Sequence, residues 1–295
     1  MKHIKGNAMA GVLVFDIETI PDAAGIRRLE GTPELVSDVD VIAKALAERK
    51  EKTGTEFMPL HLQKIVAISC VIRRTTREGL PQFKVGSLGD ETSSEKEIVQ
   101  AFFDLIEKYT PQLVSWNGSG FDLPVLHYRA LLNGVTSSRY WEMGESGDSD
   151  SRDFKWNNYI SRYHMRHIDL MDLLAKFSAR ANAPLDALAK MCGFPGKMGM
   201  DGSQVAQGFF DGKIKEIRDY CETDVVNTYL LYCRFQMMRG GVTPEEYEEE
   251  IAFVKSELLK ESKTVSGAFW QEYLNKFSSD PKDQMWSESL LNRLI

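Results

Sequence analysis

Apolar residues along the chain follow two patterns that alternate with each other. Residues 12–15 and much of the stretch 63–74 form continuous apolar runs, largely β-branched, of the kind found in buried strands. The segment between Ser94 and Thr110 instead carries apolar residues three and four positions apart, which predicts an amphipathic helix opened by a capping box. Strands that alternate with helices in this way predict an α/β layered domain.

A second capping box, from Thr243 to Glu246, has proline at its first helical position and predicts a late helix. The Arg-Gly-Gly stretch at 239–241 precedes it and marks a boundary. We therefore expect residues 1–240 to form one domain. Residues 241–295 are expected to form a helical C-terminal extension that packs on the domain or on a partner.

Two carboxylates interrupt the first apolar run. Asp16 and Glu18 lie two positions apart on the predicted strand, which ends at Pro21, so their side chains should point to one spot. Burying both acids there would be costly without a cation, and the pair is therefore a candidate half of a divalent-metal site. The alternative is a solvated strand end.

A strand, a turn and a helix follow one another in the middle of the chain. Residues 113–116 predict a short strand, 117–120 a glycine-containing turn, and Phe121 and Asp122 the start of a helix that runs to about Asn133. An acid at a helix start is stabilised by the free N–H groups, so the alternative function of Asp122 is that of a cap.

Tyr220 and Asp224 lie four positions apart on a third predicted element, a helix, and therefore share a face. The alternative is that Tyr220 is an amphipathic core residue and Asp224 a solvated one, which is the usual arrangement of such pairs.

Taken together, in this order and at these separations, the three patterns resemble the three exonuclease motifs of the four-acid 3′–5′ exonuclease superfamily. From about residue 11 to about residue 235, the chain resembles the exonuclease domain of family B DNA polymerases. It is still more similar to the free-standing predicted 3′–5′ exonucleases related to that domain, also within 196–205 and 220–225. The resemblance implies a ribonuclease-H-like fold: a mixed five-stranded sheet with helices on both faces.

The resemblance also implies a site for two divalent cations, Mg²⁺ or Mn²⁺, the hard cations that oxygen ligands select. Asp16 would bridge both cations, and Glu18 and Asp224 would complete the site of the attacking water. Asp122 would serve the second cation, partly through water. With all four acids present, an enzyme that hydrolyses phosphodiester bonds is expected.

Tyr220 matches the tyrosine that positions the attacking water, whereas the subclass that uses histidine would need that residue at Asp219. The resemblance and the glycine-rich loop at 193–202 predict further contacts with the terminal nucleotides. These substrate-binding residues are Thr19 and Ile20 (through their backbone), Asn117, Phe121 and Lys197.

Composition limits the class of protein and the cellular compartment that we expect. The 295 residues are 43% hydrophobic, which suits an ordinary globular core, and the four cysteines occur singly. Single cysteines argue against a zinc ribbon or a disulfide framework and fit a reducing compartment. Neither a secretory leader nor a membrane span is expected, so we predict a cytoplasmic protein.

A net charge of −7 disfavours tight coating of a duplex and favours transient binding to a chain end. One window is basic: residues 152–180 hold six Lys and Arg against three Asp. There, four aromatic residues interleave with cations, a pattern typical of single-strand binding; alternatively they pack a long loop onto the core. These aromatic residues are Phe154, Trp156, Tyr159 and Tyr163.

The sequence thus predicts a two-metal 3′–5′ exonuclease that acts on the 3′ end of a nucleic acid, DNA more than RNA, and releases nucleoside monophosphates. Two alternatives stay open: a non-catalytic nucleic-acid-binding module of a repair complex, and a ribonuclease of the oligoribonuclease type. The sequence contains no polymerase palm, so any proofreading or DNA repair would involve a polymerase or repair partner in trans.

Overall fold

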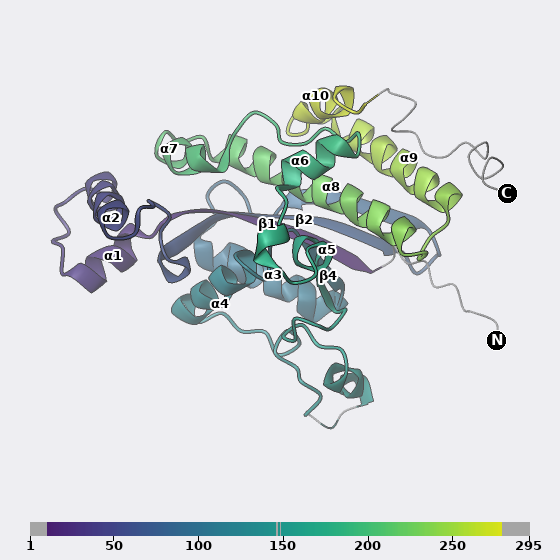
Figure 1. The fold of residues 1–295 in the computed structure, drawn as a ribbon, viewed down its shortest axis with the longest axis horizontal. Coiled ribbons are helices and arrows are strands. Elements are labelled where there is room, and N and C mark those ends of the chain that lie inside the picture. Colours follow the sequence, from purple (N-terminus) through teal and green to yellow (C-terminus); the bar gives the residue numbers. More distant parts are fainter. Residues whose placement is uncertain (1–10, 146, 148, 279–295) are drawn as a thin grey trace.

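A computed structural model describes residues 11–145, 147 and 149–278. At its centre lies one mixed sheet in the order β3-β2-β1-β4-β5 (Figure 1). β1 runs antiparallel to β2 and parallel to β4, β2 pairs antiparallel with β3, and β4 pairs parallel with β5. The strands are β1 (Val12–Pro21), β2 (Gln63–Thr75), β3 (Pro81–Ser87), β4 (Gln112–Ser115) and β5 (His167–Asp169).

Helices cover both faces of this sheet, α3 and α4 on one and α8 with α9 on the other (Figure 1). The mixed five-stranded α/β fold predicted from the sequence is therefore confirmed. The helices are α1 (Ala23–Glu30), α2 (Asp38–Thr53), α3 (Glu95–Tyr109), α4 (Asp122–Asn133), α5 (Leu170–Leu174), α6 (Leu185–Met191), α7 (Val205–Phe210), α8 (Ile214–Met238), α9 (Pro244–Glu261) and α10 (Phe269–Asn275). Short 3₁₀ turns are η1 (Leu60–Leu62), η2 (Ser149–Lys155), η3 (Ala179–Ala181) and η4 (Gly202–Gln204).

The alternation of side chains along β1 decides which helix meets the acids. Leu13 and Phe15 pack into the core under α3 and α4, whereas Val12 and Val14 pack into the core under α8. Because side chains repeat every two residues along a strand, the even-numbered Asp16 continues the face that α8 covers. β4 pairs only with the first three residues of β1, so β1 carries its acids beyond the end of β4.

The C-terminal helices α9 and α10 pack onto α8. Tyr247 and Val254 from α9, and Trp270 and Tyr273 from α10, are buried in the same core cluster as the α8 residues. The buried Glu250 of α9 also accepts two hydrogen bonds from a β2 arginine, both at 2.8 Å. The division into 1–240 and 241–295 stays a prediction, and residues 279–295 lie outside the described residues.

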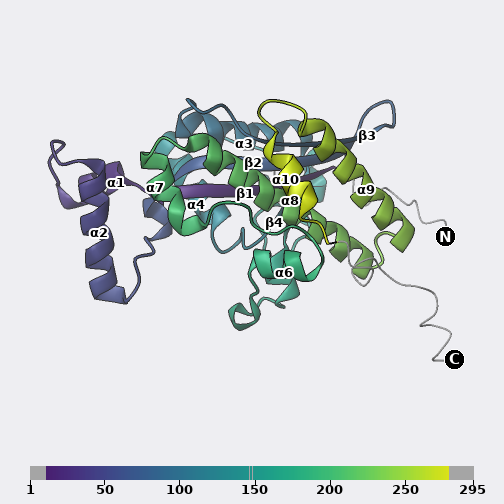
Figure 2. The same cartoon turned by 90° about the horizontal axis from the view of Figure 1, so that it is seen from above.

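Two segments project from the layered body. α1 and α2 pack against each other and protrude at one end of the molecule, beyond the last residues of β1 (Figures 1 and 2). The connection from α4 to β5 hangs below the sheet in Figure 1. Across the described residues, no helix is both long and apolar enough to cross a bilayer.

Candidate active site

Asp16 and Glu18 lie at the end of β1 on the face covered by α8. One ligand atom from each carboxylate and the Sγ of Cys221 all lie within 4.8 Å of one another. A β-bulge between Glu18 and Thr19 shifts the register with β2 directly after this pair. Bulges commonly re-aim side chains next to active sites, and here the bulge ends the regular pairing beside the acids.

Asp122 reaches the same place from the first position of α4. Its Oδ1 accepts a hydrogen bond from the backbone N–H of Ile17 at 3.2 Å, between the two acids of β1. Phe121 occupies the cap position and makes no side-chain cap bond. The predicted helix start is thus correct, and the carboxylate of Asp122 is anchored to β1.

The turn before Asp122 is held by Asp169, the last residue of β5. Its carboxylate accepts hydrogen bonds from the backbone N–H groups of Asn117 and Ser119, both at 2.9 Å, and also caps α5. A Cβ on Gly118 would lie 2.2 Å from the Ser115 hydroxyl oxygen, so the turn requires glycine there. This contact joins Asp169 to a turn 50 residues away in the sequence, so no local pattern could reveal it.

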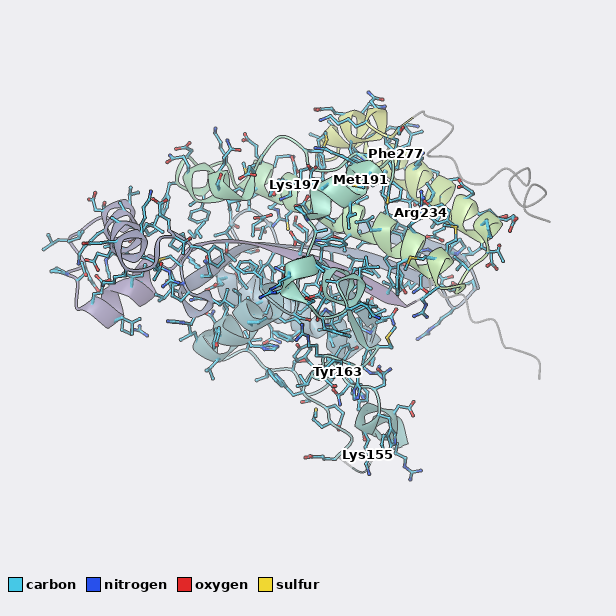
Figure 3. All side chains as sticks on the ribbon, viewed as in Figure 1. Lys155, Tyr163, Met191, Lys197, Arg234 and Phe277 are labelled. Atoms are coloured by element: carbon cyan, nitrogen blue, oxygen red, sulfur yellow. The ribbon has the colours of Figure 1, made fainter. Side chains whose placement is uncertain are left out.

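Tyr220 and Asp224 face the β1 acids from one side of α8. They are only 3% and 4% exposed, so the solvated alternative for Asp224 is wrong. The ammonium group of Lys197 donates a hydrogen bond to the Tyr220 hydroxyl, and its Nζ lies 3.4 Å from Asp224 Oδ2. Lys197, labelled in Figure 3, therefore brings the one positive charge that contacts these two groups within the described part of the chain.

Burial and mutual repulsion make these acids hard to ionise. Burial, followed by repulsion from Asp122, Glu18 and Asp224, raises the pKa of Asp16 well above its usual value. Burial, followed by repulsion from Asp224, also raises the pKa of Glu18 well above its usual value. Burial raises the pKa of Asp122 to about 7 and that of Asp224 to about 6, although Lys197 opposes the rise at Asp224. Such clustered, perturbed acids are typical of functional sites.

The donor set of this cluster fits hard divalent cations. Asp224 Oδ1 is buried and has no hydrogen-bond partner, so a bound cation would compensate its lone pairs. Burial raises the pKa of the Cys221 thiol well above its usual value, so the thiol stays protonated and donates to Asp16 at 3.6 Å. The available ligands are thus carboxylate oxygens, which suit Mg²⁺ or Mn²⁺.

Lys197 is placed by contacts that local sequence patterns do not reveal. The amide of Asn227, one turn after Asp224 on α8, pairs with both backbone polar groups of Gly196, at 2.8 and 3.2 Å. The Tyr273 hydroxyl of α10 donates to the same amide oxygen at 2.9 Å. The next N–H, that of Lys197, donates to Asp186 at 2.7 Å. The C-terminal helix is thus linked by hydrogen bonds to the backbone that carries Lys197.

The other predicted substrate contacts surround this cluster. The Thr19 hydroxyl donates to Gln63 at 3.0 Å, and the side chain of Ile20 is buried beside Tyr220, so Ile20 offers a ligand only its backbone. The rings of Phe121 and Phe57 lie 5.9 Å apart. Asn117 has a positive φ of 67°, an uncommon conformation outside glycine.

The aromatic residues of the basic segment 152–180 differ in burial, which tests the two interpretations of that segment: single-strand binding and packing onto the core. Phe154 and Tyr159 are each 2% exposed and pack with Tyr140 in the core under α3 and α4. Trp156 and Tyr163 are 76% and 71% exposed. The core-packing alternative therefore holds for the first pair, and only the second pair is exposed.

A buried arginine that sequence patterns did not single out braces the end of β1. Arg129 of α4 donates to Asp22 at 2.6 Å and to Glu95 at 2.7 Å. Glu95 in turn accepts from the backbone N–H of Ile65, the β2 residue paired with Thr19. The brace ties β1, β2, α3 and α4 together beside the acids. Its partners are far apart in the sequence, so no local spacing could reveal it.

Comparison with known proteins shows the family of the chain. The family model described as a predicted 3′–5′ exonuclease related to the exonuclease domain of PolB matches residues 55–277. The chain therefore belongs to this family. The matched range includes Asp122, Tyr220 and Asp224 and begins after the two acids of β1. No curated protein matches the chain.

Proposed function

We propose that the protein is a metal-dependent 3′–5′ exonuclease that hydrolyses phosphodiester bonds at the 3′ end of single-stranded DNA and releases nucleoside monophosphates. The observation that carries the proposal is the meeting of four acids from three distant elements: the half-buried Asp16 and the buried Glu18 from β1, and the buried Asp122 from α4 and Asp224 from α8. Membership in a family of predicted exonucleases supports it independently.

These four acids would hold two divalent cations, Mg²⁺ or Mn²⁺. Such a pair, when bound, activates a water and neutralises the charge on the attacking and leaving oxygens. The protein supplies a cradle that is rigid before binding. Asp122 is anchored to the Ile17 N–H, and the Arg129 brace lies beside the end of β1. Rigid placement reduces the reorganisation that the reaction would otherwise need.

Tyr220 would position the attacking water. Burial, followed by repulsion from Asp224, raises the pKa of its phenol well above the usual value, so the group keeps its proton at neutral pH. It therefore acts as a hydrogen-bonding group and not as a general base. Lys197, whose ammonium already contacts Tyr220 and Asp224, would face the scissile phosphate.

The terminal nucleotide would lie against the backbone of Thr19 and Ile20, with Asn117 and Phe121 on the opposite side. The relation of the family to a DNA polymerase domain favours DNA over RNA as the substrate. By the same relation, the protein would act on ends produced during DNA repair or by a polymerase working in trans. The single cysteines favour a reducing compartment, and we propose the cytoplasm.

The direct test is digestion of 5′-labelled single-stranded DNA, duplex DNA and matched RNA in Mg²⁺, Mn²⁺ or EDTA. We expect a ladder that shortens from the 3′ end of single-stranded DNA only with metal. Asp16→Asn should lower the rate roughly a thousandfold, because several kcal/mol of transition-state stabilisation is lost. The exposed Asp104 on α3 offers a matched control, and Asp104→Asn should digest normally.

Binding without cleavage by the unaltered protein in both metals would contradict the proposal and favour a non-catalytic module. Faster digestion of RNA than of matched DNA would instead indicate a ribonuclease of the oligoribonuclease type.

A further inference from the structure

A cavity of about 640 Å³ opens beside the turn that leads to Asp122, at the carboxyl ends of β4 and β5. β1, β4 and β5 run parallel, so their carboxyl ends share one edge of the sheet with Asp16 and Glu18. Ligands of open α/β sheets bind at this edge. The lining includes Asn117, His127, Arg162, His167, Phe177 and Asn182.

The backbone around this cavity is strained. Four non-glycine residues of the described chain have positive φ, and Asn117 and Phe177, which both line the cavity, are two of them, at 67° and 61°. Lys176, directly before Phe177, is a third, at 52°. Residues held in such conformations cluster at ligand-binding sites, because packing must compensate for the strain. Here a residue in this conformation, Phe177, brings an aromatic ring to the cavity.

That ring belongs to an aromatic and cationic group at the cavity mouth. The guanidinium of Arg162 lies 5.4 Å from the centre of the Phe177 ring, and the exposed Tyr163 ring meets it edge-on at 5.1 Å. Tyr163 sits on the segment that descends from the sheet toward Lys155 (Figure 3). Aromatic rings beside cations form platforms on which bases of single-stranded nucleic acid stack.

The inner walls combine apolar side chains with a smaller polar part and carry little net positive charge. Burial lowers the pKa of both His127 and His167 to about 4, so both rings are neutral at pH 7. Arg162 is already paired with Asp172, at 2.7 Å, and Asp169 also lines the cavity. These acids oppose a free anion, and the arginine opposes a free cation. A flat, neutral group with polar edges, such as a nucleobase, fits this lining better than either ion.

We propose that this cavity binds a nucleobase of the substrate strand on the 5′ side of the terminal nucleotide, with Phe177 as the stacking residue. The proposal rests on the proposed exonuclease function. The turn that leads to Asp122 also forms one wall of the cavity, through Asn117 and Gly120. A 3′–5′ exonuclease acts on the chain end, so a subsite beside that of the terminal nucleotide receives an upstream base. The excess of cations in 152–180 favours the phosphates of this strand.

The test combines a protein change with a substrate change. Phe177→Leu keeps an apolar side chain and removes the stacking face. Single abasic residues are placed in turn at each of the upstream positions of a single-stranded DNA. In the unaltered protein, one abasic position should lower kcat/KM on the order of tenfold, as expected for the loss of one stacked base. Phe177→Leu should lose about as much on intact DNA and lose nothing further at that position.

Tyr109→Leu is the matched control. Tyr109 and Phe177 are both 37% exposed, and Tyr109 also has an arginine near its ring, that of Arg74 at 5.0 Å, yet it lies outside the cavity lining. The control should respond to the abasic position as the unaltered protein does. Equal sensitivity at all upstream positions, or the same abasic penalty in Phe177→Leu, would overturn the proposal.

A binding measurement separates this proposal from the exonuclease assignment. Asp16→Asn, with and without Phe177→Leu, is titrated into 5′-fluorescent single-stranded DNA in Ca²⁺ and followed by anisotropy. We expect the added change to weaken binding on the order of tenfold to intact DNA and to leave binding to the sensitive abasic DNA unchanged. If the protein binds in this way but the unaltered protein never cleaves DNA, the subsite proposal stands and the exonuclease assignment fails. If the protein cleaves DNA but Phe177→Leu changes neither assay, the exonuclease assignment stands and the subsite proposal is overturned.

Discussion

The carboxylate of Asp122 and the backbone N–H of Ile17 form a hydrogen bond of 3.2 Å across 105 residues of sequence. Ile17 separates the two acids of β1, so this single bond sets the position of the α4 acid relative to both. It also raises the question of whether Asp122 contributes through its charge or through the bond alone.

Asp122→Asn answers that question, because the amide oxygen can still accept from Ile17 while the charge is lost. We expect Mn²⁺-dependent release of mononucleotides to fall by roughly a hundredfold or more. The melting temperature without metal should be at least as high as before, because burial disfavours the ionised carboxyl. Calorimetry and the labelled-DNA assay measure the two effects. Full activity in Asp122→Asn would show that the charge is not needed.

The pH dependence of stability without metal follows from the raised pKa values of Asp122 and Asp224, to about 7 and about 6. The pKa of an aspartate in an unfolded chain is about 4. Between pH 4 and pH 7, roughly, these two carboxyl groups hold more protons in the folded state than in the unfolded chain. The free energy of unfolding therefore falls as the pH rises through this range. In EDTA, Asp224→Asn should lose less stability between pH 5 and pH 8 than the unaltered protein does.

Metal binding should show the opposite trend, because cations bind ionised carboxylates. We expect millimolar Mn²⁺ to raise the melting temperature, and to raise it more at pH 8 than at pH 5.5. Asp16→Asn should greatly reduce the shift, and Asp104→Asn should keep it. A shift of equal size in all three proteins would indicate metal bound elsewhere.

Lys197 offsets part of the repulsion among the acids. Lys197→Gln should therefore lower the melting temperature in EDTA and enlarge the increase that Mn²⁺ produces, since the cations then replace the missing charge. Lys50→Gln removes a lysine that pairs with Glu56 on the surface at 2.7 Å and should change neither quantity beyond the error of the scan. An unchanged melting temperature in Lys197→Gln would show that the charge has no influence there.

Tyr273→Phe tests whether α10 positions Lys197 through Asn227. Loss of one buried hydrogen bond should cost about 1 kcal/mol of stability. We also expect kcat to fall several-fold with KM little changed, because the ammonium is less well held and not removed. Tyr232→Phe deletes a comparable bond, to Gln112 at 2.7 Å, far from the Lys197 loop. If both variants lose the same stability and neither loses kcat, α10 has no positioning function.

Much of the fold and part of the site follow from local sequence patterns. The two-residue period of β1 predicts that Asp16 and Glu18 face one way, and the turn before Asp122 predicts where α4 begins. α1 escapes such analysis, because its cap position, Asp22, makes no side-chain cap bond and bonds Arg129 instead. Tertiary contact, and not local preference, stabilises that helix start.

The contacts that hold the site together have no local signature. Asn227 bonds Gly196 across 31 residues and Tyr273 across 46, and Asp169 bonds Ser119 across 50. Asn227, Tyr273 and Asp169 are each an ordinary polar residue within their own helix or strand. Only the folded arrangement shows that Asn227 helps to place Lys197 and that Asp169 helps to place Asp122.

The most direct test of the central claim is the anomalous scattering of manganese in crystals grown with Mn²⁺. The account predicts two peaks about 3.5–4 Å apart. They should be ligated by Asp16, Glu18, Asp122 and Asp224, with Asp224 Oδ1 among the ligand atoms. Crystals that show no manganese at these four carboxylates, at a concentration that supports digestion of DNA, would contradict it.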